Sequence, residues 1–204
     1  MAISTYSELQ TACTNWLARA DLASRIVEFI ALAEDTLNKR VRIRAMEQRA
    51  TATVSTEYVV LPTDFLEMRN FQLNTNPKQT LRLVTPEYID TFWAGSTTGK
   101  PKLYTFIGGE IQLAPSPDGS YTAEMDFYEK WDIATDLTNW LLTNAPSAYL
   151  YGSLLQAEPF LKNDKRIGVW ERRFETSIND IQKADKGDRW SGNSLAIRAD
   201  ITPV

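Results

Sequence analysis

The sequence predicts an α+β fold, in which helices from both ends of the chain form a bundle and a small antiparallel β subdomain is inserted between them. Apolar residues recur at helical spacing near both ends, whereas the period changes to two from Ala50 onwards. The apolar stripes of the C-terminal helices need partners, which the N-terminal helices supply. We therefore expect a helical bundle of residues 1–49 and 137–187, a β-rich insertion of residues 50–136 and an extended arm of residues 188–204.

Two helices are expected before the insertion. Residues 4–19 form the first, because Thr5 and Glu8 have the spacing of a capping box. Cys13 lies on its apolar stripe and is expected to be a small core residue rather than a reactive thiol. The second helix is expected to run from Asp21 to near Met46, with one apolar face made of Ile26, Phe29, Ile30, Ala33, Leu37 and Val41.

The end of the second helix is rich in cations, including Arg40, Arg42 and Arg44. Arg40 and Arg44 are four residues apart and would share a helix face. These arginines form a cationic patch suited to phosphate or to an acidic partner. The alternative is a solvated helix end, where cations also suit the helix dipole. The sequence leaves both interpretations open.

The middle of the chain is expected to be mainly strands. Residues 50–54 and 58–61 should form a hairpin, followed by extended segments at 65–73 and 81–84. Thr85 and Pro86 should open a short helix. The clearest β signal is the pair of strands 103–107 and 110–113 around Gly108 and Gly109, whose missing side chains suit a two-residue turn. A strand from Tyr121 to Phe127 is expected to complete an antiparallel meander with them.

Two further helices are expected between residues 146 and 187. Pro146 suits the first turn of a helix, because its missing amide hydrogen would have no partner there. Asn163 or Asp164 would cap the next helix, and Gly187 would close it.

The C-terminal arm has the periodicity of a strand, because Leu195, Ile197, Ala199 and Ile201 alternate with other residues. An apolar strand at a chain end favours aggregation unless it pairs with a sheet or packs into a groove. We interpret it as an arm that joins a partner's sheet or groove, while a disordered terminus or a strand of its own sheet remains the alternative. The candidate docking residues are Trp190, Leu195, Ile197, Arg198 and Ile201.

Composition argues against several classes of protein. The formal net charge is −4 with no histidine and one cysteine, which argues against histidine-based catalysis, the usual zinc sites and an internal disulfide. No apolar run approaches the ~20 residues of a membrane span, and no secretory signal is apparent at the N-terminus. We therefore expect no enzyme, no cofactor, no metal and no membrane partner.

Two other functions are alternatives to a structural role. A cell-wall (peptidoglycan) hydrolase would use paired carboxylates, for which Glu171 and Glu175 are the candidates. These residues sit among Arg172 and Arg173, as on an ordinary charged helix face. A nucleic-acid-binding module is disfavoured by the acidic net charge and by the absence of a recognised motif.

Several segments together resemble the head–tail adaptors of short-tailed bacteriophages, also called tail tubular protein A-like proteins. No single segment is specific enough to identify the family. The resemblance depends on the order and spacing of the segments along nearly the whole chain. The matching segments are Phe29–Glu34, Leu37–Arg40 with Arg42, Leu61–Phe65, Pro101–Tyr104, Ile111–Pro117 and Tyr149–Leu155.

This resemblance implies a structural protein of the virion that is made in the host cytoplasm and lies at the head–tail junction. It implies a ring, expected to be a dodecamer, between the portal protein and the tail nozzle or tail tube protein. DNA would pass through the lumen without sequence-specific binding, and the C-terminal arm would dock into the portal. Arg40, Arg42 and Arg44 would then be cations of the lumen or of a subunit interface.

Overall fold

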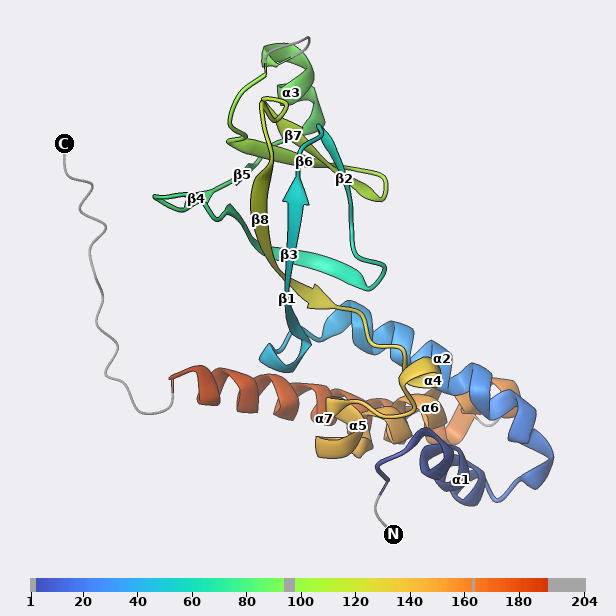
Figure 1. Ribbon diagram of the computed structural model, residues 1–204. Helices are drawn as coiled ribbons and strands as arrows, with labels where there is room; N and C mark the ends of the chain where they lie inside the picture. Colours follow the sequence, from blue (N-terminus) through green and yellow to red (C-terminus); the bar gives the residue numbers. More distant parts are fainter. Residues whose placement is uncertain (1–2, 94–97, 163, 191–204) are drawn as a thin grey trace. The chain divides into compact units, whose positions relative to one another are not determined.

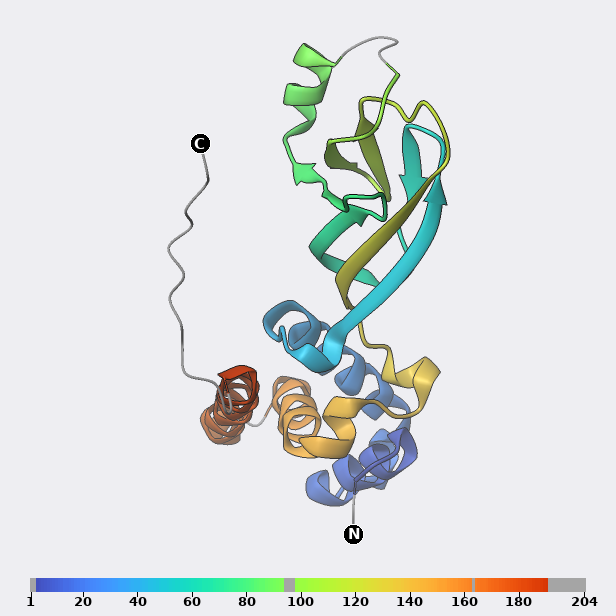
Figure 2. The same ribbon diagram turned by 60° about the vertical axis from the view of Figure 1, so that its left-hand side comes forward.

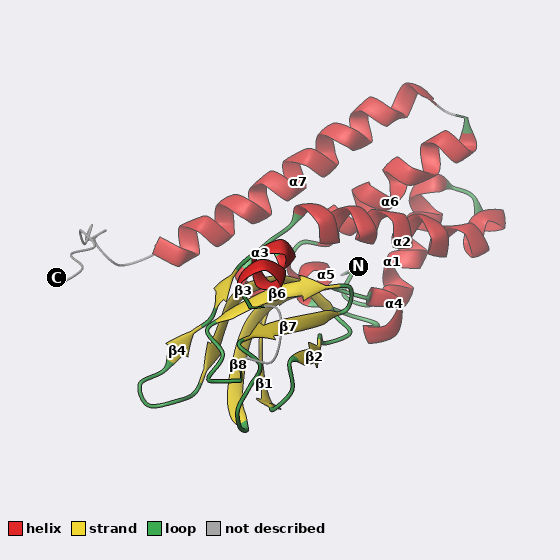
Figure 3. Ribbon diagram, turned by 90° about the horizontal axis from the view of Figure 1, so that it is seen from above, coloured by secondary structure: helices red, strands yellow, loops and turns green. Residues whose placement is uncertain are grey.

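The computed structural model describes residues 3–93, 98–162 and 164–190. The chain divides into two compact units, a helical unit up to Ala45 and from Trp131 onwards, and a β unit, Met46–Lys130. Within the described ranges, every strand belongs to the β unit and every α-helix except α3 (Pro86–Phe92) belongs to the helical unit (Figures 1 and 3). The predicted α+β class is therefore confirmed.

Helix α1 (Tyr6–Leu17) begins as the sequence predicts. The side chain of Thr5 accepts a hydrogen bond from the backbone of Glu8, and the Glu8 carboxylate accepts one from the Thr5 backbone in return. This capping box satisfies two amide groups that the first turn would otherwise leave unpaired. Cys13 is buried on the inner face of α1, where burial raises the pKa of its thiol to about 12. It is a core residue, as predicted.

Helix α2 (Ala23–Arg40), which follows the short 3-10 helix η1 (Ala20–Leu22), ends earlier than expected. All six residues of its predicted apolar face are buried, but Val41 adopts an extended backbone instead of continuing the helix. Arg42 donates hydrogen bonds from Nη1 to the carbonyl oxygens of Asn38 (2.6 Å) and Val41 (2.7 Å). The arginine side chain thus satisfies carbonyls that a longer helix would have paired. A second 3-10 turn, η2 (Arg44–Met46), leads into the β unit.

Two buried polar side chains of α2 hold the segment that returns from the β unit. The Asn38 amide donates to the carbonyl of Trp131 (2.9 Å) and accepts from its backbone nitrogen (3.0 Å). The Glu34 carboxylate accepts from the backbone of Ile133 (2.9 Å) and from the hydroxyl of Tyr149 (2.8 Å). These bonds fix the segment that leads into helix α4 (Ile133–Asp136) beside α2, while helix α5 (Trp140–Asn144) packs against α6 (Pro146–Leu161). Burial and the charge of Glu34 raise the pKa of Tyr149.

Helix α6 (Pro146–Leu161) lies between α2 and α7 (Asp164–Trp190) (Figure 2). Gly152 makes this close approach possible, because a Cβ atom there would lie 2.9 Å from Cε2 of Phe174 and 3.1 Å from Cβ of Ala33. Phe174, Ile178 and Ile181 are buried along the inner stripe of α7. The predicted end at Gly187 is wrong, since α7 continues to Trp190.

The β unit contains two four-stranded sheets with the strand orders β1-β8-β3-β4 and β2-β7-β6-β5. The strands of the first sheet are β1 (Glu47–Val54), β8 (Tyr121–Glu129), β3 (Phe65–Leu73) and β4 (Gln79–Thr80). Those of the second are β2 (Tyr58–Val60), β7 (Glu110–Ala114), β6 (Leu103–Ile107) and β5 (Arg82–Leu83). The sheets share one apolar core, made of Val54, Phe71, Leu73, Leu81, Tyr104, Ile111, Leu113 and Ala123.

Most strands were placed correctly, but two predicted pairings are wrong. β1 and β2 do not form a hairpin, because β1 pairs with β8 and β2 pairs with β7, in different sheets. Likewise β8 does not extend a meander from β7 but lies between β1 and β3. Only the hairpin of β6 and β7 has the predicted partners, with Gly108 at a φ of +61° in its turn.

Candidate interaction surfaces

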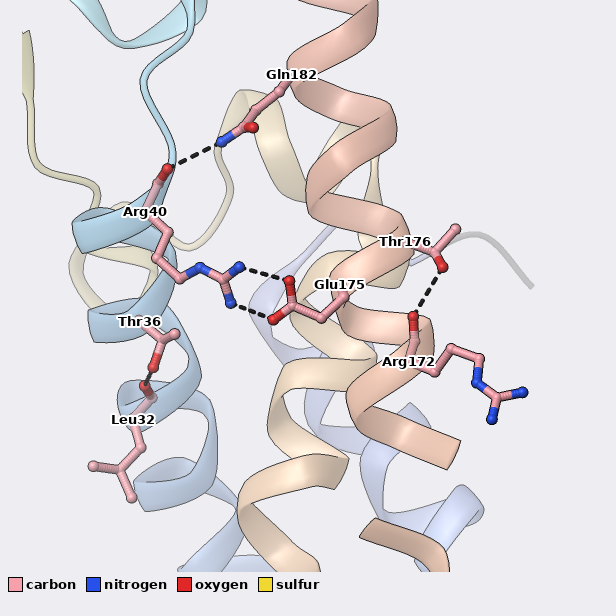
Figure 4. A network of polar contacts seen from close by, with 7 residues as sticks. All are labelled: Leu32, Thr36, Arg40, Arg172, Glu175, Thr176 and Gln182. Carbon is pink, nitrogen blue, oxygen red and sulfur yellow. Dashed lines mark hydrogen bonds and ion pairs between the residues drawn. The ribbon is translucent and has the colours of Figure 1, made fainter. Parts of the chain in front are cut away.

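Arg40 lies at the last turn of α2 and is paired with α7. Its guanidinium donates two hydrogen bonds to the Glu175 carboxylate, at 2.5 and 2.6 Å (Figure 4). The amide of Gln182 also donates to the Arg40 carbonyl at 3.1 Å. These contacts join the C-terminal end of α2 to α7, and they balance the charge of Arg40.

Arg44 also finds its partners on α7. Its side chain lies 3.2 Å from the carboxylate of Asp185 and 3.0 Å from that of Asp188. Because α2 ends at Arg40, the predicted common helix face of Arg40 and Arg44 is wrong. The three arginines do come together at the end of α2, but Arg42 caps carbonyls there, while Arg40 and Arg44 form ion pairs within the chain.

The two carboxylates considered for hydrolysis, Glu171 and Glu175, lie in surroundings unlike those of a glycosidase pair. A glycosidase general acid needs a raised pKa, but the hydrogen bond from Arg40 lowers the pKa of Glu175. Glu175 is held in a structural ion pair, and Glu171 is an exposed residue one turn earlier on α7. The pair therefore gives no support to the hydrolase alternative.

A basic pocket lies between α6 and α7 of the helical unit. Its volume is about 430 Å³, and its lining includes Ser147 and Tyr151 from α6 and Arg172, Arg173 and Thr176 from α7. The Arg173 guanidinium lies over the Tyr151 ring, 5.4 Å from its centroid, and donates to the Tyr151 hydroxyl at 3.2 Å. Arg172 points away from the Arg40–Glu175 pair (Figure 4). No Asp or Glu from the described part of the chain lines this pocket.

An aromatic cluster adjoins the basic pocket. The rings of Trp16, Tyr151 and Trp170 lie 5.6 to 6.1 Å apart, and Trp16 is 46% exposed. The Trp170 indole donates to the buried carboxylate of Glu158 at 2.8 Å, which fixes the ring. Tyr151 therefore offers a rigid wall, which is the kind of surface that protein interfaces favour.

The β unit has an acidic face, defined here as Tyr58, Val60, Asp90 and Glu110. Tyr58 and Val60 lie on the edge strand β2, Glu110 is the register partner of Val60 on β7, and Asp90 belongs to α3. Partial burial and the nearby carboxylates of Glu57, Asp90 and Glu110 raise the pKa of Tyr58. Val60 is 73% exposed, so the face combines apolar surface with negative charge.

Sequence reasoning missed both of these surfaces. Arg172 and Arg173 were assigned to an ordinary charged face, and Asp90 and Glu110 were not singled out. A signal for the pocket was present, because Ser147 and Tyr151 are four residues apart and Val169, Arg172, Arg173 and Thr176 follow helical spacing. The sequence could not show that these residues of α6 and α7 line the same pocket.

The predicted docking residues of the arm lie almost entirely outside the described residues. Trp190 is the last residue of α7. Leu195, Ile197, Arg198 and Ile201 fall outside the description. Within residues 3–93, 98–162 and 164–190, no cluster of three His, Cys, Asp or Glu could hold a metal ion. In the same ranges, no helix combines the length and the apolar character needed to cross a membrane.

The family model of the SU10 adaptor protein matches residues 4–198, which include both units. The chain belongs to this family of bacteriophage head–tail adaptors. The resemblance read from the sequence is therefore confirmed. A comparison with curated proteins found no match. Family membership makes this adaptor a structural component of a virion and implies that it interacts with phage portal and tail proteins.

Proposed function

We propose that this adaptor forms a closed ring, expected to be a dodecamer, at the head–tail junction. The ring would lie between the portal protein and the tail nozzle or tail tube protein, and DNA would pass through its lumen. The observation that carries the proposal is the family match over residues 4–198, because it spans both units and continues beyond α7.

The electrostatics of the chain suit DNA passage without tight binding. The net charge is −4, and a strongly basic lumen would hold phosphates and slow the DNA. Arg40 and Arg44 already have carboxylate partners in Glu175, Asp185 and Asp188. Wherever the end of α2 lies in the ring, as lumen wall or as subunit interface, these two arginines add little net positive charge.

The C-terminal arm is the part that we propose docks onto the portal protein. Its apolar residues Leu195, Ile197 and Ile201 alternate with Ala196, Arg198 and Asp200. An extended segment of this kind adds to a partner's sheet or fills its groove, using alternate side chains for specificity. A single arm would bind weakly, but a closed ring of arms would hold strongly through multivalency.

The test is to mix the purified adaptor with its portal protein and to examine the complex by native mass spectrometry and electron microscopy. The full chain should form a ring on the portal. Deletion of Trp190–Val204 should leave the circular dichroism spectrum and the unfolding transition nearly unchanged but abolish portal binding.

A matched pair of variants separates docking from a general effect of the tail. Changing Leu195, Ile197 and Ile201 to serine should abolish portal binding, whereas changing Ala196 to serine and Asp200 to asparagine on the other side of the strand should preserve it. Unchanged portal binding by the truncated chain would refute the docking arm. Failure of the full chain to form any ring on the portal would refute the proposed function.

A further inference from the structure

The basic pocket between α6 and α7 has the properties of a site for carboxylates. Arg172 forms no ion pair with any residue that the structure describes, and among the same residues the Arg173 guanidinium contacts the Tyr151 side chain rather than a carboxylate. The planar guanidinium presents paired N–H donors that match the geometry of a carboxylate. Two arginines in one hollow of about 430 Å³, with no acidic residue in its described lining, therefore favour a partner that brings carboxylates.

The charge of this chain is divided unequally between its two units. The β unit contains eleven Asp and Glu residues against seven Lys and Arg, so it carries the whole formal charge of −4. The helical unit contains fifteen of each and is formally neutral. A second copy of the chain therefore brings a negatively charged unit that can meet the pocket.

Several acidic side chains of the β unit already have partners. Glu124 is bound by Arg49, and Glu47 is paired with Arg69. Glu57 accepts hydrogen bonds from Gln112 and Ser116. Asp90 and Glu110, in contrast, are exposed and have no ion-pair partner among the described residues. Both carboxylates lie near the exposed Tyr58 on the open edge strand β2.

We infer that the basic pocket of one copy binds the acidic face of a second copy, with Arg172 and Arg173 paired to Asp90 and Glu110. The exposed Tyr58 and Val60 on the edge strand β2 would gain cover from the same contact. Because the two surfaces differ, each copy can offer its pocket to one neighbour and its acidic face to another, and repetition of this head-to-tail contact produces a ring when the rotation closes. This inference rests on the proposed ring and names the surfaces that would build it.

Charge reversal tests the contact. The pocket variant carries Arg172→Glu and Arg173→Glu, and the face variant carries Asp90→Lys and Glu110→Lys. In each variant alone, pocket and face have the same sign, so self-association measured by sedimentation velocity should weaken about tenfold or more. A mixture of the two variants restores opposite signs at every contact. It should therefore associate like the unchanged chain, with the two variants alternating in the assembly.

The control carries Lys165→Glu and Arg166→Glu, which change the charge of exposed cations at the start of α7 by the same amount outside the pocket. Its self-association should stay close to that of the unchanged chain. The variants should also be compared as rings on the portal by electron microscopy. Equal weakening by the control, undiminished rings from each single variant, or no recovery in the mixture would overturn the contact. Those results would leave a ring of the unchanged chain, and hence the proposed function, standing.

Discussion

Gly152 and Gly187 are both helical glycines, but only one of them is required by packing. A Cβ atom at position 152 would press on Phe174 and Ala33, whereas a Cβ at position 187 meets nothing within 4 Å. The sequence suggested instead that Gly187 is required, as the residue that ends the last helix. The structure shows Gly187 inside α7, where glycine is less favourable than alanine.

The two substitutions to alanine should therefore have opposite effects. Gly152→Ala overpacks the contact of α6 with α2 and α7 and should lower the free energy of unfolding by about 1–3 kcal/mol. Gly187→Ala should leave it unchanged or raise it by up to ~1 kcal/mol. Urea denaturation followed by far-ultraviolet circular dichroism measures both. A destabilising Gly187→Ala would indicate a left-handed cap at that position.

Glu124 on β8 has a carboxyl pKa well below its ordinary value. Hydrogen bonds from Arg49 and Asn74 lower the pKa of its carboxyl to about 2, against an ordinary value of 4.5. As the pH falls, the Glu124 carboxyl takes up a proton at a higher pH in the unfolded chain than in the folded chain. The stabilisation is therefore complete above about pH 4.5 and is lost as the pH falls from there towards about 2.

Glu124→Gln should remove this pH dependence. We expect the variant to have a lower melting temperature than the unchanged chain at pH 7. The difference between the two should be smaller at pH 3, because the ionised Glu124 carboxylate stabilises the unchanged chain less at that pH. Glu129→Gln, on the same strand, is the matched control and should show a smaller loss at pH 7. A constant difference between the Glu124 variant and the unchanged chain at both pH values would contradict this assignment.

At the scale of elements, positions of helices and strands were easier to predict than their partners. Thr5 and Glu8 marked the start of α1 correctly because a capping box is local. The strands β1 and β2 were found from their alternation, but this pattern gives only the face of a strand and not its neighbour. Glu47 pairs with Tyr128 and Val54 with Tyr121, and no short-range signal in the sequence encodes such distant pairs.

The end of α2 was predicted wrongly for a related reason, because it too depends on residues distant in the sequence. No glycine or proline marks it, and the residues that determine it are a side-chain cap from Arg42 and acids far along the chain in α7. The polar residues Glu34 and Asn38 gave a usable signal, since they are four apart beside the apolar stripe of α2. Polar side chains at such positions are expected to be buried and hydrogen-bonded.

Asn38 should therefore matter more to α2 than its size suggests. Asn38→Ala leaves the backbone nitrogen and carbonyl of Trp131 without their partner and should lower the free energy of unfolding by about 2–4 kcal/mol. Thr36→Ala is the control on the same helix, because the Thr36 hydroxyl is exposed and bonds only its own helix at Leu32 (Figure 4). It should change the stability by less than about 0.5 kcal/mol. Equal effects of the two substitutions in urea denaturation would show that the Asn38 bonds contribute little.

At the scale of the whole molecule, the β unit is an insertion in the sequence of the helical unit. The β unit begins at Met46 and ends at Lys130, and these two residues adjoin the neighbouring strands β1 and β8, in which Glu47 pairs with Tyr128. Its two sheets enclose a core of their own, centred on Leu73, Ile111 and Leu113. An insertion with adjacent ends and its own core has the properties of a domain that folds independently.

We therefore expect a fragment of residues 46–130 to fold alone. A chain of this size buries about 60% or more of the surface that it exposes when unfolded, which is enough for a stable small domain. The fragment should give a single cooperative urea transition and a near-ultraviolet circular dichroism signal from its packed aromatic side chains. As an internal control, Leu113→Ala should shift that transition by about 2–5 kcal/mol, because Leu113 is buried between the sheets. A broad transition without near-ultraviolet signal would mean that the β unit depends on the helical unit to fold, and the acidic face would then have to be studied only in the full chain.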